Sequence, residues 1–111
     1  MNYYESNDLS RFAEVGKFKK DLMDKFFEYY TSVTNTDGAL TKREKSLIAL
    51  AVAHSKQCPY CIDAYTTQCL ETGADPDQMT EAVHVAAAME AGITLVHAVQ
   101  MHNALDKKGA L

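Results

Sequence analysis

A helix that is apolar on every side is the strongest constraint in this 111-residue sequence. Thr41 and Glu44 have the spacing of a capping box, in which each side chain accepts a hydrogen bond from the other residue's backbone N–H. A helix is therefore predicted to begin near Lys42, and it runs through seven consecutive apolar residues, Leu47–Ala53. Because this run presents apolar side chains all around the helix, other helices must surround it. We expect it to form the centre of the core.

Two further helices are indicated on either side of this one. Apolar residues recur at spacings of three or four between Leu9 and Val33, which predicts an amphipathic helix with a break near Gly16. Pro59 suits the first position of a helix, where its missing N–H has no intrahelical partner, so Cys58 is placed at the N-cap of a third helix. A glycine at position 73 ends that helix.

The last third of the chain repeats these start and stop signals. Asp75 as N-cap, Pro76 at the first position and Gln78 three residues after the cap predict the start of a fourth helix. The pair Ala91-Gly92 is predicted to divide it from a final helix that runs from position 93 to about Lys107. The sequence therefore predicts an all-α protein of about five or six helices.

Composition limits the chain to one domain and argues against one class of partner. With 111 residues and 47% hydrophobic content, the chain has material for a single core, so we expect one compact helical domain over residues 1–111. Eleven basic residues against fifteen acidic ones give a net charge of −4, which argues against a nucleic-acid partner.

Two observations bear on membranes and on compartment. The apolar stretch from Ala82 to Val99 is interrupted by His84, Glu90 and His97, which favours a buried helix over a membrane span. The first residues lack the basic and then apolar segments of a secretory signal. We therefore expect a cytoplasmic protein without a membrane partner.

Two of the three cysteines form a CxxC motif at the predicted start of the third helix. A helix N-terminus stabilises a thiolate through its unpaired N–H donors and the positive end of the helix dipole. With Cys58 at the cap and Cys61 one turn into the helix, the two sulfurs lie near enough to form a disulfide. Spacing alone leaves open which cysteine attacks, although the cap position favours Cys58 as the more acidic thiol.

A zinc site and a purely structural pair are the competing interpretations of this motif. His54 precedes Cys58 by four residues, but a structural zinc site needs four ligands and the sequence has no second CxxC. A metal would need another histidine or a second subunit, so we expect neither a metal nor another cofactor. Two buried cysteines acting as small apolar residues are a weaker reading, and this role suits Cys69 better. The further candidate ligands are His84, His97 and His102.

His54 and two tyrosines are the candidate helpers of the thiols. An imidazole titrates near neutrality, so His54 is a candidate for proton transfer, while its position at the end of an apolar helix fits a structural role equally well. Tyr65 lies one turn after Cys61, and Tyr60 lies between the cysteines. Either phenol can donate a hydrogen bond to a thiolate or bound oxygen, although core packing is the better account of each tyrosine taken alone.

The order of these segments resembles the alkylhydroperoxidase D and carboxymuconolactone decarboxylase-like superfamily. The resemblance rests on the apolar run Leu47–Ala53, the segment Cys58-Pro59-Tyr60-Cys61-Ile62-Asp63-Ala64 and the alanine-rich helix after Gly73, and it covers roughly residues 40–99. It implies an all-helical fold that assembles into homo-oligomers, commonly trimers or hexamers. The segment around the cysteines is also similar to an arsenosugar-biosynthesis-associated, peroxidase-like group.

The resemblance implies a chemistry and an assignment of roles. In the redox branch, Cys61 would attack a peroxide or a disulfide, Cys58 would resolve the product, and an external dithiol would reduce the resulting bond. That branch usually has a histidine and a glutamate at the positions where this chain has Tyr65 and Ser46, so the usual proton relay is absent here. A thiol-dependent peroxidase or disulfide oxidoreductase using Cys61, Cys58, His54 and Tyr65 is the leading hypothesis. A metal-binding or assembly module and a carboxymuconolactone decarboxylase-like enzyme are the alternatives.

Overall fold

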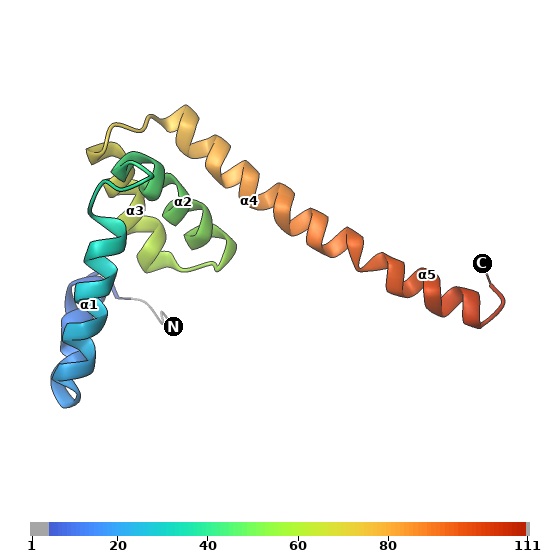
Figure 1. Cartoon of the computed structure of the whole chain (residues 1–111), viewed down its shortest axis with the longest axis horizontal. Coiled ribbons are helices and arrows are strands. Elements are labelled where there is room, and N and C mark those ends of the chain that lie inside the picture. The colour runs from blue at the N-terminus through green and yellow to red at the C-terminus, as the bar shows by residue number, and fades with distance from the viewer. Residues whose placement is uncertain (1–4, 111) are drawn as a thin grey trace.

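The computed structural model describes residues 5–110, and these residues form helices joined by short connections, with no strand among them (Figure 1). The prediction of an all-α fold is confirmed. The elements in chain order are a 3-10 helix η1 (Leu9–Phe18), α1 (Lys20–Thr34), α2 (Lys42–Ser55), α3 (Pro59–Glu71), α4 (Pro76–Val96) and α5 (Ala98–Lys107).

Side-chain caps fix the starts of the three central helices where the sequence places them. The Thr41 hydroxyl accepts from the Glu44 N–H at 3.1 Å, and the Glu44 carboxylate accepts from the Thr41 N–H at 2.8 Å. Asp75 and Gln78 form the same reciprocal pair at the start of α4, with distances of 2.8 and 3.0 Å. Cys58 is the N-cap of α3. These three predicted starts are confirmed.

The first predicted helix is divided into η1 and α1. The chain turns at Lys19, whose φ and ψ are −148° and 61°, three residues after the predicted break. Gly16 is buried where the two elements pass each other, and a Cβ placed on it would lie 2.7 Å from the Cβ of Met23. Glycine is therefore required for this close approach.

The predicted division of the last helix at Ala91-Gly92 is wrong. Helix α4 continues through these residues to Val96, and the interruption lies at His97, after which α5 begins. A glycine inside a helix costs only about 1 kcal/mol relative to alanine, so without a cap or proline beside it Gly92 does not end the helix.

The core lies between α2, α3 and the first turns of α4. Leu50, Cys69 and Ala74 are almost completely buried, and Leu47, Tyr65 and Met79 pack against them. The expectation that other helices surround α2 is wrong for the single chain. Ile48 is 52% exposed and Val52 is 53% exposed, because they lie on a face of α2 that no other element within residues 5–110 covers.

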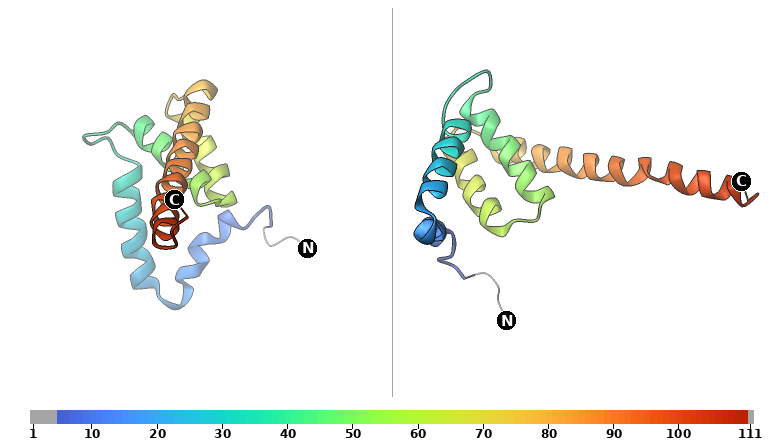
Figure 2. Two further views of the ribbon diagram at one scale, coloured as in Figure 1. Left: turned by 90° about the vertical axis from the view of Figure 1, so that its right-hand side faces the viewer. Right: turned by 60° about the horizontal axis from the view of Figure 1, so that its bottom comes forward.

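The single chain is elongated, because α4 and α5 leave the core as one long projection (Figures 1 and 2). Its radius of gyration is 19.2 Å, against about 13 Å for a compact chain of this length. We call residues 87–107 the arm. The expectation of a buried helix from residue 82 to 99 is wrong here, since Met89 and Val96 are each 61% exposed. Within residues 5–110, the helical stretch Pro76–Lys107 contains an 18-residue window with a mean hydropathy of 1.5, long and apolar enough by composition alone to cross a bilayer.

Candidate active site

The two cysteines of the CxxC motif lie side by side at the start of α3. Cys58 has extended backbone angles and its sulfur accepts from the Cys61 N–H at 3.3 Å, while Pro59 occupies the first helical turn. Both are free thiols, half-buried, and their Sγ atoms are 2.8 Å apart. A disulfide has an S–S distance of about 2.05 Å, so a movement of less than about 1 Å closes the bond.

A tight turn between α2 and α3 holds Cys58 in this position. Gln57 adopts a positive φ of 54°, a left-handed conformation that reverses the chain within a few residues. The N–H of Gln57 donates to the His54 carbonyl at 3.1 Å, and the N–H of Cys58 donates to the Ala53 carbonyl at 3.0 Å. The end of α2 thereby positions the cap of α3.

The surroundings of the two thiols move their pKa values in opposite directions. A hydrogen bond with the Cys61 thiol, together with backbone N–H groups of Cys61 and Tyr60, lowers the pKa of Cys58. Burial raises the pKa of Cys61 to about 11, and the hydrogen bond and charge of Cys58 act in the same direction. Cys58 is therefore the thiol favoured to ionise first, as its cap position indicated.

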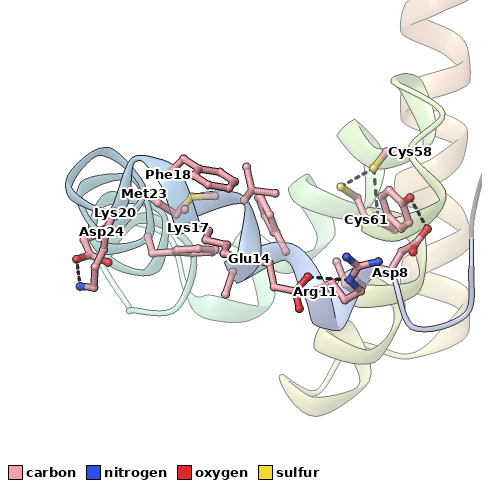
Figure 3. Close-up of a pocket in the computed structure, with 17 residues that line it drawn as sticks. Asp8, Arg11, Glu14, Lys17, Phe18, Lys20, Met23, Asp24, Cys58 and Cys61 are labelled. Carbon is pink, nitrogen blue, oxygen red and sulfur yellow. Dashed lines mark hydrogen bonds and ion pairs between the residues drawn. The ribbon is translucent and has the colours of Figure 1, made fainter.

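A large apolar groove opens in front of the two thiols (Figure 3). It has a volume of about 1270 Å³, and its far wall is formed by η1 and the start of α1. We call it the η1–α3 groove. Cys58, Tyr60 and Cys61 lie at one end of it. Its apolar lining includes Leu9, Phe12, Val15, Met23 and Phe27.

A hydrogen bond joins Asp8, the residue before η1, to the cysteine motif. The Tyr60 hydroxyl donates to Oδ2 of Asp8 at 2.9 Å across 52 residues of sequence (Figure 3). The backbone N–H of Glu5 and the Tyr60 hydroxyl both stabilise this carboxylate, which lowers the pKa of Asp8. Sequence reasoning missed Asp8 and the wall that follows it, because no local pattern pairs residues so distant.

His54 is tied to its own helix. Its Nδ1 lies 2.9 Å from the Leu50 carbonyl, which can only accept, so Nδ1 carries the proton and Nε2 is left as the acceptor of the neutral ring. His54 does not line the η1–α3 groove. Its role in proton transfer stays a prediction.

The polar contact of Tyr65 is with a residue of α1. Its hydroxyl is hydrogen-bonded to the hydroxyl of Tyr30, and its ring packs against the core. Burial, followed by the hydrogen bond with Tyr30, raises the pKa of Tyr65, and the charge of nearby Cys61 adds to this effect. Tyr65 is therefore a neutral hydrogen-bonding group and not a base. No local sequence pattern indicates Tyr30 as its partner, because the two residues lie 35 positions apart.

The other expected helpers and metal donors lie apart from the thiols. Ser46 is buried at 1% exposure, and its hydroxyl donates to the Lys42 carbonyl at 2.8 Å. Residues 5–110 contain no group of three or more His, Cys, Asp and Glu side chains that could hold a metal. His84, His97 and His102 are on the long projection of α4 and α5. A zinc site at Cys58 would therefore require donors from a second subunit.

Comparison with known proteins identifies the family to which the chain belongs. It is 44% identical over 85 residues to a Paracoccus denitrificans protein described as uncharacterized protein 4 in the cox locus, covering 77% of each chain. It is 29% identical over 72 residues to mouse Sestrin-2, of which it spans only 15%. A crystal structure of a carboxymuconolactone decarboxylase family protein from Legionella pneumophila matches with a TM-score of 0.62 and 31% identity, covering 92% of this chain and 97% of that one.

The family model for carboxymuconolactone decarboxylases matches residues 20–104, which includes the cysteine motif and most of the helices. The resemblance noted in the sequence is thereby confirmed at the level of the superfamily, whose members are decarboxylase-like or alkylhydroperoxidase-like enzymes. On its sequence and its fold together, this chain belongs to the carboxymuconolactone decarboxylase family.

Proposed function

We propose that this protein is a thiol oxidoreductase in which Cys58 and Cys61 cycle between a dithiol and a disulfide. The observation that carries the proposal is the 2.8 Å separation of two free thiols at the N-terminus of α3, facing an open groove. A structural pair of cysteines would need no access from a groove.

With a peroxide as substrate, the chemistry has two steps. The Cys58 thiolate attacks one oxygen of the peroxide, which forms a sulfenic acid on Cys58 and releases an alkoxide or hydroxide that takes up a proton. The Cys61 thiol then attacks the Cys58 sulfur, forming the disulfide and releasing water. With a disulfide as substrate, the same thiolate forms a mixed disulfide that Cys61 resolves. An external dithiol returns the pair to its reduced state.

The geometry favours this order of attack over the one implied by family resemblance. Attack requires a thiolate, and the lowered pKa belongs to Cys58, whereas burial keeps Cys61 protonated near neutral pH. A protonated Cys61 donates a hydrogen bond to the Cys58 thiolate, keeps its own proton and remains available as the resolving thiol. Neither step of this cycle requires His54 or Tyr65.

A decarboxylase acting on a lactone acid is the second candidate, and the groove suits it less well. Such a substrate is an anion and needs unpaired cations around it. The basic residues that line the groove are Arg11, Lys17 and Lys20. Arg11 pairs with Glu14 at 2.8 Å and Lys20 pairs with Asp24 at 2.6 Å, whereas Lys17 lies over the Phe18 ring, 5.6 Å from its centroid. The remaining lining near the thiols is mainly apolar.

The proposal is tested by adding hydrogen peroxide, an alkyl hydroperoxide or a small disulfide to the fully reduced protein. We expect loss of both motif thiols and an intact mass that falls by two hydrogen atoms, with peptide mapping that joins Cys58 to Cys61. In Cys61→Ser, the peroxide reaction should stop at a sulfenic acid on Cys58, which a dimedone-type reagent traps. Cys58→Ser should lose the fast reaction.

The third cysteine supplies a matched control. Cys69 is completely buried in the core, and burial raises the pKa of its thiol, so Cys69→Ala should keep the reaction. Motif thiols that remain reduced with every oxidant would overturn the proposed function. A sulfenic acid that forms on Cys61 in Cys58→Ser at the rate of the unmodified protein would reverse the assigned roles.

A further inference from the structure

We propose that Asp8 and Tyr60 are positioning residues for the cysteine pair. Through the hydroxyl of Tyr60, the Asp8 carboxylate holds the first turn of α3 in the conformation in which its N–H groups face the Cys58 sulfur. Neither residue takes part in the bonds made and broken during the redox cycle. The effect of this contact on the reaction rate rests on the proposed function, whereas its effect on the thiols can be measured without an oxidant.

Tyr60 connects the thiolate site to the wall of the η1–α3 groove. It is the second residue of α3, and its backbone N–H is one of the groups that lower the pKa of Cys58. Its side chain is half-buried, and the hydroxyl donates to Oδ2 of Asp8 at 2.9 Å (Figure 3). The residue that supplies a donor to the Cys58 sulfur is therefore itself held at the far end of its side chain.

Asp8 is a well-fixed acceptor, because its own groups are bound within the turn that precedes η1. Its Oδ2 also accepts from the Glu5 N–H at 2.8 Å, and its N–H donates to the Glu5 carbonyl at 3.1 Å. Its carbonyl accepts from the Arg11 N–H at 2.9 Å. The hydrogen bonds from Glu5 and Tyr60, with a smaller effect of the Arg11 charge, lower the pKa of Asp8. The carboxylate is thus ionised near neutral pH, and a charged acceptor forms a stronger hydrogen bond than a neutral one.

The turn at Asp8 is connected to a larger support formed by η1 and α1. The ring centroids of Phe12 and Phe27 are 5.2 Å apart, and Gly16 permits the close approach of the two helices. Helix α1 is in turn joined to α3 by the contact between the hydroxyls of Tyr30 and Tyr65. Helix α3 is therefore tied to η1 and α1 at two places, one beside the thiols and one further along the helix.

The first turn of α3 gains from an external restraint because its own cap is weak. The acceptor at its N-cap is the sulfur of Cys58, and sulfur is a weak hydrogen-bond acceptor. In α2 and α4, a side chain of the first turn also accepts from the N-cap N–H. In α3, the Cys58 N–H donates instead to the Ala53 carbonyl at the end of α2. The contact between Tyr60 and Asp8 adds a side-chain restraint at this point.

The direction of the change in the Cys58 pKa separates three ways in which the contact could act. If it orders the turn, its loss raises this pKa, because the N–H donors and the Cys61 thiol are held less well toward the sulfur. If it only shielded the sulfur from water, its loss would lower the pKa, because burial raises it. If the Asp8 charge acted directly on the thiolate, removing the charge would also lower the pKa.

The test is the pH dependence of iodoacetamide labelling at Cys58 in the full, reduced chain. Tyr60→Phe keeps the ring and removes the hydroxyl, while Asp8→Ala removes the acceptor. Each should raise the midpoint of the labelling curve by at least about 0.3 pH unit, a twofold change of the ionisation constant. Asp8→Asn keeps a carbonyl acceptor without the charge, so its midpoint should lie closer to that of the unmodified protein than to that of Asp8→Ala.

Tyr65→Phe is the matched control. It removes the other phenol contact of α3 and leaves the first turn unchanged, so the midpoint for Cys58 should not move. Circular dichroism verifies that each variant keeps its helices, and Asp8→Ala carries the test should Tyr60→Phe fail to fold. Equal shifts in the two Tyr→Phe variants would show a general loosening of α3 and would overturn the inference.

Other results would also overturn it. A midpoint that stays the same or falls in Tyr60→Phe and Asp8→Ala would show that the contact is structural or that it shields the sulfur. A fall in Asp8→Asn would show that the carboxylate acts through its charge.

The rate with hydrogen peroxide separates this inference from the proposed function. Near pH 7, Tyr60→Phe should react about twofold more slowly than the unmodified protein, and it should recover at higher pH, where Cys58 is fully ionised in both. A shifted midpoint in a protein whose thiols ignore every oxidant would support the positioning role and contradict the redox function. An unshifted midpoint with normal peroxide reduction would do the reverse.

Discussion

The two motif thiols should react with an alkylating agent at very different rates. With a pKa of about 11, Cys61 is about 0.1% thiolate near pH 8, whereas a free cysteine with a pKa of about 8.5 is about 24% thiolate. The more basic thiolate is the stronger nucleophile, and a Brønsted slope of about 0.4–0.5 recovers about tenfold to twentyfold. Cys61 should therefore react about 10 to 25 times more slowly than a free thiol.

Cys58 should show the opposite behaviour. Its pKa is lowered by the hydrogen bond with Cys61 and by backbone N–H groups, so its thiolate persists at lower pH than that of a free thiol. The curve of its alkylation rate against pH should have a midpoint below about 8.5, while the curve for Cys61 should still be rising above about pH 10.

The assay is iodoacetamide labelling of the reduced protein, with glutathione as the free-thiol reference and peptide mapping to separate the two sites at early times. Initial rates are needed because alkylation of Cys58 removes its charge and its hydrogen bond from Cys61. Equal rates at the two sites, or faster labelling of Cys61, would refute the argument that the helix cap and burial divide the pKa values.

Four further substitutions test how the fold supports the site, each followed by urea unfolding at fixed protein concentration. Thr41→Ala should lower the free energy of unfolding by about 1 kcal/mol, since it removes an N-cap, and an unchanged midpoint would contradict the capping box. Gly16→Ala should destabilise by about 1–3 kcal/mol, because the new Cβ meets α1, while Gly92→Ala has open space and should be neutral or stabilising. Tyr65→Phe should cost about 1 kcal/mol through loss of the Tyr30 contact and leave the peroxide rate unchanged; a slower rate would give Tyr65 a part in the chemistry.

Local signals predicted the starts of the central helices and the place of the motif. The caps at Thr41, Cys58 and Asp75 depend on side chains within three residues of the backbone groups they satisfy, so the sequence contains the whole interaction. The ends were harder to predict. A glycine at position 92 resembles a stop signal, but α4 continues through it. The conformational cost of one glycine is small compared with the backbone hydrogen bonds that the continuing helix keeps.

Features that depend on contacts between residues far apart in the sequence could not be predicted from local patterns. The hydrogen bond between Tyr60 and Asp8 and the contact between Tyr65 and Tyr30 join residues separated by 52 and 35 positions. The apolar pattern of residues 82–99 predicted a buried segment, whereas Met89 and Val96 are each 61% exposed in the single chain. The prediction of burial therefore failed for the single chain.

The position of Cys58 at the start of α3 explains why the dithiol site lies beside an apolar groove. A thiolate needs N–H donors and access for its substrate, and both require Cys58 to lie at a helix start beside an opening. An opening lined by apolar side chains exposes surface that water does not favour, which leaves the η1–α3 groove in need of an apolar occupant. Substitutions in the arm should leave the pKa of Cys58 unchanged, because every group that lowers this pKa lies within α3.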